Sequence, residues 1–201
     1  MEGLLRIAAF ASHGGSNLQA LIDGCVAGQI AGEIVLVISN NRKAYALERA
    51  RIYQIETLVI SDTEFDSETA FAQELVRQLA ARSVGLICLA GYMKKMPNDV
   101  IRAYHNRILN IHPALLPKFG GKGMYGIHVH EAVLAAGEKE TGVTIHLVDE
   151  VYDNGKIVAQ RRVPVNPDDT PESLQQKVLE MEHQLYPETV ARIASGELRL
   201  E

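Results

Sequence analysis

The stretch Leu4-Leu-Arg-Ile-Ala-Ala-Phe10, followed at once by Ala11-Ser-His-Gly-Gly-Ser-Asn17, decides the fold class. Its first half is a mostly apolar run, which is typical of a parallel strand buried on both faces. Its second half is a glycine-containing turn, and apolar residues then recur at helical spacing, at Leu18, Leu21, Ile22, Cys25 and Val26. A buried strand, a tight turn and an amphipathic helix in this order predict the first unit of an α/β sheet.

The same alternation continues along the first half of the chain. We expect further strands at Ile34–Ser39, Thr57–Ile60 and Val84–Ala90, with helices between them at Ala44–Ile52 and Ser67–Arg82. Alternating strands and helices of this length indicate right-handed βαβ units around a mostly parallel, twisted, Rossmann-like sheet. The strand at Val84–Ala90 contains no charged residue, so we expect it at the centre of the sheet.

The pattern changes in the second half. Lys118–Gly126 is glycine-rich and is expected to be a mobile loop before a helix at Val129–Ala136. Gly142–Val148 and Ile157–Val165 are expected to be strands, and the segment between them contains Asp153-Asn-Gly155. Because Asp-Asn-Gly favours a turn, these two strands are predicted to pair in antiparallel fashion.

The chain is expected to finish with a long helix at Pro171–Ala194, bent near Pro187. Thr170 is suited to cap its N-terminus, and Pro171 fits the first helical position. No internal repeat or interdomain linker is visible, so we predict a single domain that spans residues 1–201.

Composition excludes several classes of protein. The net charge of −5 and the lack of a basic stripe argue against nonspecific nucleic-acid binding. Cys25 and Cys88 form neither a disulfide framework nor a metal-ligand spacing, which suits a reducing compartment. No export signal and no apolar run long enough to cross a bilayer are present. We therefore expect a cytoplasmic protein, monomer or homodimer, whose partners are small molecules rather than nucleic acid or membrane.

Three segments follow expected strands, at Ser12–Asn17, Gly91–Met96 and Asn110–Pro117; the apolar run before the last one ends at Leu109. In a parallel sheet, ligands bind beyond the carboxyl ends of the strands. We therefore expect these three segments to lie along one edge and to form the functional site.

The first of these segments contains Gly14-Gly15-Ser16-Asn17, at the start of a helix. Free backbone amides and the helix dipole form an anion site at such a position. The dinucleotide-binding spacing G-x-G-x-x-G is missing, and the second strand ends in Ser39-Asn40-Asn41, without a carboxylate for a ribose. The loop therefore suits a single phosphate, although an ordinary N-cap turn has the same pattern.

The third segment, Asn110-Ile-His-Pro-Ala-Leu-Leu-Pro117, combines an amide donor with a base that titrates near neutral pH. Asn110 and His112 are two residues apart, so on an extended chain both side chains point the same way. Together they could hold and protonate an oxygen that becomes negative during acyl transfer. The alternative is an Asn that caps a turn and a His that packs against prolines.

Taken in order, these segments resemble the phosphoribosylglycinamide formyltransferase (glycinamide ribonucleotide transformylase) family. The matching stretches are Gly15-Ser16-Asn17-Leu18-Gln19-Ala20, Ser39-Asn40-Asn41, Leu89-Ala90-Gly91-Tyr92-Met93, Asn110-Ile111-His112-Pro113, Leu115-Leu116-Pro117, Asp153-Asn154-Gly155 and Glu182-His183. They span almost the whole chain. The resemblance implies transfer of a formyl group from 10-formyltetrahydrofolate to the amine of glycinamide ribonucleotide, in purine biosynthesis and without a metal.

The resemblance also implies a role for each matching residue. The catalytic group would be Asn110, His112 and Asp153, with the Asp153 carboxylate favouring the charged form of His112. The phosphoribosyl group would be held by Gly15, Ser16, Asn17 and Glu182. The folate would lie against Asn110, the segment Leu147–Asp153, and Met93, Lys94, Lys95 and Met96.

The chain departs from the family pattern at three places. Glu68 stands where relatives often have an arginine that reaches the folate, and Leu179 stands where relatives have Lys or Gln near the phosphate. The Lys118–Gly126 loop is also longer than in many relatives. His128, His130 and His146 could line the acceptor site, although each alone is more often structural, and His13 is expected to be exposed.

Other functions remain open at this point. A formyltetrahydrofolate deformylase-like hydrolase would use a similar Asn–His–Asp group, but that family carries an additional N-terminal domain. Methionyl-tRNA formyltransferases carry a basic C-terminal extension, which is not seen here. A non-catalytic phosphosugar-binding regulator would not need Asn110, His112 and Asp153 together.

Overall fold

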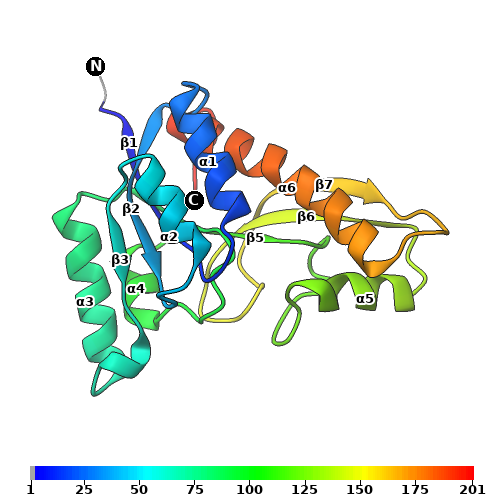
Figure 1. The fold of residues 1–201 in the computed structure, drawn as a ribbon, viewed down its shortest axis with the longest axis horizontal. Coiled ribbons are helices and arrows are strands. Elements are labelled where there is room, and N and C mark those ends of the chain that lie inside the picture. The colour runs from blue at the N-terminus through cyan, green and yellow to red at the C-terminus, as the bar shows by residue number, and fades with distance from the viewer. Residues whose placement is uncertain (1–2) are drawn as a thin grey trace.

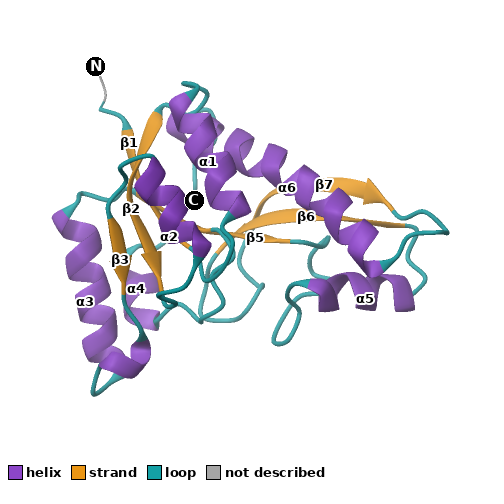
Figure 2. Cartoon of the chain, in the orientation of Figure 1, coloured by secondary structure: helices purple, strands orange, loops and turns teal. Residues whose placement is uncertain are grey.

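Helices cover both faces of one seven-stranded mixed sheet in the computed structural model, which describes residues 3–201 (Figures 1 and 2). The strand order is β3-β2-β1-β4-β5-β6-β7. The first five strands are parallel, whereas β6 is antiparallel to both β5 and β7. The strands are β1 Leu5–Phe10, β2 Gly32–Ser39, β3 Thr57–Val59, β4 Leu86–Leu89, β5 Ile108–His112, β6 Glu140–Leu147 and β7 Ile157–Pro164. This arrangement confirms the predicted fold class, with the uncharged β4 at the centre.

The helices are α1 Ser16–Val26, α2 Tyr45–Ile52, α3 Glu68–Ala81, α4 Asn98–Ala103, α5 Ile127–Ala135 and α6 Pro171–Ala194, with a 3-10 turn at Asp62–Glu64. Thr170 caps α6 as expected, because its side chain accepts a hydrogen bond from the backbone N–H of Ser173. The sequence did not predict α4, whose six residues are too few for a helical period to be visible.

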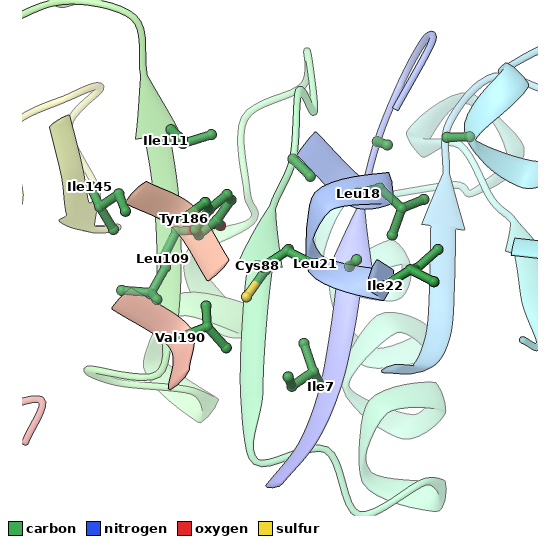
Figure 3. Close-up of a cluster of buried hydrophobic side chains, with 14 of the residues drawn as sticks. Ile7, Leu18, Leu21, Ile22, Cys88, Leu109, Ile111, Ile145, Tyr186 and Val190 are labelled. Atoms are coloured by element: carbon green, nitrogen blue, oxygen red, sulfur yellow. The ribbon is translucent and has the colours of Figure 1, made fainter. Parts of the chain in front are cut away.

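The core lies in two layers because successive strand side chains point to opposite faces of the sheet. Ile7 and Ala9 of β1 belong to the layer under α1, α2, α5 and α6, whereas Ala8 and Phe10 belong to the layer under α3 and α4. Figure 3 shows the first layer, where side chains from β1, β4 and β5 meet α1 and α6. Its labelled members are Ile7, Leu18, Leu21, Ile22, Cys88, Leu109, Ile111, Ile145, Tyr186 and Val190.

Strand β5 differs from the sequence-based expectation in one respect that affects the site. Its apolar run was expected to end at Leu109, but the strand continues through Asn110 to His112. The added residues pair with β6, so that Asn110 lies opposite His146 and His112 opposite Thr144. Pro113 then ends the strand, since proline cannot donate to the ladder.

Within residues 3–201, no helix is both long enough and apolar enough to cross a membrane.

Candidate active site

A cavity of about 930 Å³ lies at the carboxyl edge of the parallel strands. All three segments that were expected at this edge contribute to its wall, together with Gly121–Gly126, the segment before β7, and α6. The prediction of a shared edge is therefore confirmed. The residues that line this cavity include Gly15, Ser16, Asn17, Met93, Lys94, Lys95, Met96, Asn110, His112, Gly121, His130, His146, Asp153, Leu179 and Glu182.

His146 holds the Asn110 side chain in place. Its Nδ1 lies 2.8 Å from the carbonyl oxygen of Leu147, so this nitrogen must carry the proton that is donated. In the neutral ring, Nε2 is then an acceptor, and Asn110 Nδ2 donates to it over 3.0 Å. The sequence indicated only that His146 could line the acceptor site, and it did not predict the contact with Asn110.

His112 is buried, and both of its ring nitrogens face acceptors. Nε2 donates to the carbonyl oxygen of Phe119 at 2.7 Å, and Nδ1 lies 3.6 Å from Asp153 Oδ2. Burial nevertheless lowers the pKa of His112 below its ordinary value, although the Asp153 charge and the Phe119 bond oppose this effect. Asp153 therefore acts in the direction that the resemblance implies, since it favours the charged form of His112, but burial outweighs its effect on the pKa.

Asp153 lies at the centre of the group. Its Oδ2 accepts a hydrogen bond from the Gly121 N–H at 2.9 Å, and its Oδ1 lies 3.5 Å from both Asn110 Nδ2 and His146 Nε2. Burial raises the pKa of Asp153, but His146, His112 and the Gly121 N–H outweigh burial, so the pKa is lowered. The carboxylate is therefore ionised at neutral pH.

The backbone of the turn between β6 and β7 places Asp153 at this position. Asp153 has a left-handed φ of 54°, in the turn that leads from β6 to β7. A side chain at Gly155 would place its Cβ 1.8 Å from the carbonyl oxygen of Leu147, so only glycine fits where the turn crosses the end of β6. The Asp-Asn-Gly sequence therefore returns the chain to the edge of the sheet.

The glycine loop, Gly14-Gly15-Ser16-Asn17, lies at the N-terminus of α1, as the sequence predicts. Gly15 has a left-handed φ of 69° and is the N-cap residue, with no side-chain hydrogen bond at that position. The Asn17 side chain does not point freely into the cavity, because its Nδ2 donates to Glu182 Oε2 at 2.8 Å. Its Oδ1 is buried and has no partner among the described residues. Asn17 therefore links the loop to α6.

Glu182 is an acid with little access to solvent. It is 7% exposed, and burial raises its pKa to about 7, although the hydrogen bond from Asn17 lowers it in part. A carboxyl group that titrates near neutral pH therefore lies beside the expected phosphate loop.

The segment expected to contact folate forms another wall. The Met93 N–H donates to Ser12 Oγ at 2.8 Å, which fastens this segment to the end of β1. Met96 is buried, whereas Lys94 forms an exposed ion pair with Asp62.

The remaining histidines singled out in the sequence differ in their exposure. His13 is exposed, as expected. His130 is buried and its Nδ1 has no partner among residues 3–201; burial, and then the charge of His112, lower its pKa to about 4. His128 is exposed and contacts Glu131.

The two positions that depart from the family pattern lie in different places: Leu179 lines the cavity, whereas Glu68 lies in the first turn of α3. No group of three His, Cys, Asp or Glu side chains in residues 3–201 is arranged to hold a metal.

The chain is similar in sequence to known formyltransferases. A family model described as formyl transferase matches residues 5–190. The phosphoribosylglycinamide formyltransferase of Arabidopsis thaliana, named as chloroplastic, is 44% identical over 195 residues, covering 96% of this chain and 67% of that protein. The phosphoribosylglycinamide formyltransferase of Haemophilus influenzae is 38% identical over 196 residues, covering 98% of this chain and 90% of that protein. The chain also matches 14% of the Drosophila melanogaster trifunctional purine biosynthetic protein adenosine-3 at 44% identity, with 95% of this chain covered.

Solved structures agree with these relatives. Glycinamide ribonucleotide transformylase 1 from Symbiobacterium toebii superimposes with a TM-score of 0.92 at 41% identity, covering 100% of this chain and 92% of that one. A formyltetrahydrofolate deformylase from Pseudomonas syringae has a TM-score of 0.87 at 22% identity, covering 100% of this chain and 64% of that one. At that identity the second likeness shows a shared fold and no more.

Proposed function

Since this chain belongs to the formyl transferase family, we propose that it is a phosphoribosylglycinamide formyltransferase. It transfers the formyl group of 10-formyltetrahydrofolate to the amine of glycinamide ribonucleotide, a step of purine biosynthesis. The observation that carries this proposal is that one cavity contains both the glycine loop and the Asn110–His112–Asp153 group. A phosphorylated acceptor bound at the loop can therefore present its amine to a formyl group held beside His112.

The chemistry requires an oxyanion and a proton transfer. The amine attacks the formyl carbon, the carbonyl oxygen becomes negative, and the carbon–N10 bond then breaks. The amine loses one proton overall and N10 gains one. Asn110 is placed to stabilise the oxyanion, because preorganised donors favour the charge that develops in the transition state.

His112 is suited to carry the proton between the two nitrogens. The neutral ring, favoured by burial, can accept a proton from the amine as it attacks. The ionised Asp153 at 3.6 Å stabilises the imidazolium that forms, and this imidazolium can then protonate N10 as it leaves. His112 therefore acts first as a base and then as an acid.

We assign the binding of the two substrates to residues that line the cavity. The backbone N–H groups of Gly15, Ser16 and Asn17 bind the acceptor's phosphate, and Glu182 holds Asn17 beside it. Met93–Met96 and the end of β6 enclose the folate, which is a co-substrate and not a resident cofactor. We assign no metal to the reaction. A cytoplasmic location and a monomeric or homodimeric state are part of this proposal.

A deformylase-like hydrolase remains the second candidate, because the same catalytic group could direct water to the formyl carbon. The phosphate loop favours the transferase, since a hydrolase has no phosphorylated acceptor to hold. A non-catalytic regulator is disfavoured because an ionised Asp153 beside a buried His112 has no evident use in binding alone.

One experiment separates these functions. Purified protein is mixed with 10-formyltetrahydrofolate, with and without glycinamide ribonucleotide, and both loss of the formyl group and formylation of the acceptor are followed. The transferase loses the formyl group only when the acceptor is present. Loss without the acceptor identifies a hydrolase, and binding without turnover identifies a regulator.

A further inference from the structure

Helix α2 contacts the backbone of the glycine loop and of His13, which precedes it. The N–H of Ala46, in its first turn, donates to the carbonyl oxygen of His13 at 3.0 Å, and Arg49 Nε donates to the carbonyl oxygen of Gly14 at 2.8 Å. A Cβ on Gly15 would lie 2.7 Å from the Cβ of Ala46, so the loop packs directly on the helix. Three consecutive loop residues are thus fixed by one helix.

This contact decides where the loop amides point. In a planar trans peptide, the C=O and the following N–H point in opposite directions. Because the carbonyls of His13 and Gly14 face α2, the N–H groups of Gly14 and Gly15 face away from it. None of the N–H groups of residues 13–17 donates to an acceptor within residues 3–201. They are therefore free to bind an anion.

The charge of Arg49 is not neutralised by a carboxylate. Besides Gly14, its guanidinium contacts Gln19 Oε1 at 3.0 Å and lies over the Tyr45 ring at 5.0 Å, and it forms no ion pair within residues 3–201. Arg51, on the same helix, is paired with Glu48 instead. The positive charge of Arg49 therefore remains available to an anion at the loop.

Arg49 of α2 lies near α6 as well as near the loop. A second cavity contains both Arg49 and Ser16 of the loop, together with His183 of α6. Burial, and then the charge of Arg49, lower the pKa of His183. Glu180 opposes this effect, but the positive charge still acts at the position where α6 faces the loop.

We propose that Arg49 is a positioning residue for a phosphomonoester dianion at the glycine loop. It holds the Gly14 carbonyl so that the loop amides face the ligand, and it supplies a positive charge that has no direct carboxylate partner within residues 3–201. This inference rests on the proposed function, because the acceptor's phosphate is the dianion concerned. Arg49 does not touch the reacting atoms, so it affects binding of the acceptor and not the chemical step.

The test compares Arg49→Gln with Arg51→Gln, since each removes one positive charge from α2. Arg49→Gln should raise the KM for glycinamide ribonucleotide about tenfold or more, because a charge-assisted hydrogen bond and a nearby charge are both lost. Its kcat and its KM for the folate should stay close to wild type. Arg51→Gln should change none of these, and Arg49→Lys, which keeps the charge, should lie between Arg49→Gln and wild type.

Inorganic phosphate provides a second readout that does not depend on the acceptor. Its dissociation constant, measured by NMR titration of the loop amides, should rise in Arg49→Gln and not in Arg51→Gln. An unchanged acceptor KM and an unchanged phosphate affinity in Arg49→Gln would overturn the inference, as would equal losses in kcat and in both KM values. If wild-type protein does not formylate glycinamide ribonucleotide, the proposed function fails, and the phosphate titration alone then decides the role of Arg49.

Discussion

Asn110 and His146 are cross-strand partners on β5 and β6, and the amide nitrogen of Asn110 donates to His146 Nε2 at 3.0 Å. The other nitrogen of His146 donates to the Leu147 carbonyl, so the ring cannot turn without losing both bonds. The buried polar face of β6 therefore sets the direction of the Asn110 side chain, which we propose to be catalytic. This is a role for His146 in orientation, since the proposed chemistry does not use it directly.

The first prediction tests that role. His146→Leu removes the acceptor for Asn110, and kcat should fall roughly three- to tenfold, the usual effect of one net hydrogen bond. His146→Gln can present an oxygen near the position of Nε2 and should restore part of the loss. Steady-state kinetics of both variants, with thermal unfolding to confirm that they are folded, measures this. Equal losses in the two variants would show that His146 only fills space.

The second prediction concerns Asn110 and His112, the two residues proposed to carry the chemistry. Asn110→Ala and His112→Ala should each lower kcat far more than they raise either KM, because both residues are assigned to charge that forms only during reaction. Losing an oxyanion donor costs about 10²–10³ in kcat. Single-turnover rates at saturating substrates measure the chemical step. Near-normal turnover in either variant would leave Asn110 and His112 as structural residues.

The third prediction concerns Glu182 and pH. Its pKa is about 7 in the fold and near 4.5 when unfolded, so the folded state binds the proton more tightly between these values. The free energy of unfolding should therefore decrease as pH rises from about 4.5 to 7, by on the order of 3 kcal/mol at most. Glu182→Gln is neutral at every pH and should remove this part of the pH dependence.

Urea unfolding of wild type and Glu182→Gln at pH 5 and pH 8 measures the effect. Glu180→Gln is the matched control, because Glu180 is exposed on the same helix. If wild type and Glu182→Gln lose the same stability between the two pH values, Glu182 is already ionised in the fold and its burial has been compensated elsewhere.

Much of the fold was predictable because the pattern of buried residues is local. The expected strands and helices that recur in the structure agree at their ends to within two residues. The pairing of β5 with β6 was not predicted, because this antiparallel register joins residues that are 32 to 38 positions apart in the chain and leaves no local pattern. Pro113 marked the end of the strand but could not show where pairing began.

The site was predictable in part for the same reason. The glycine loop, Met93–Met96 and Asn110 lie at one edge because the strands that lead to them are parallel, so their carboxyl ends meet there. The contacts of His112 with Phe119 and of Asp153 with Gly121 use a backbone carbonyl and a backbone N–H, which nearly every residue type supplies. Side-chain chemistry in the sequence therefore could not reveal them.

The last prediction joins Asp153 to His112, two residues that are far apart in the chain and 3.6 Å apart in the fold. Asp153 raises the pKa of His112 against the effect of burial, so Asp153→Asn should lower that pKa further. Asn keeps the shape of Asp and can still accept the hydrogen bond from Gly121. NMR titration of the His112 ring in both proteins, without substrates, measures the change.

Asp153→Asn should also lower kcat. Without the carboxylate, the imidazolium that forms during reaction loses its stabilising partner, so kcat should fall although His112 is intact. The double variant with His112→Ala should be little worse than the more damaged single variant, because residues that act as a unit are not additive. An unchanged His112 pKa, together with losses that multiply in the double variant, would show that Asp153 serves only the turn before β7 and that His112 works without it.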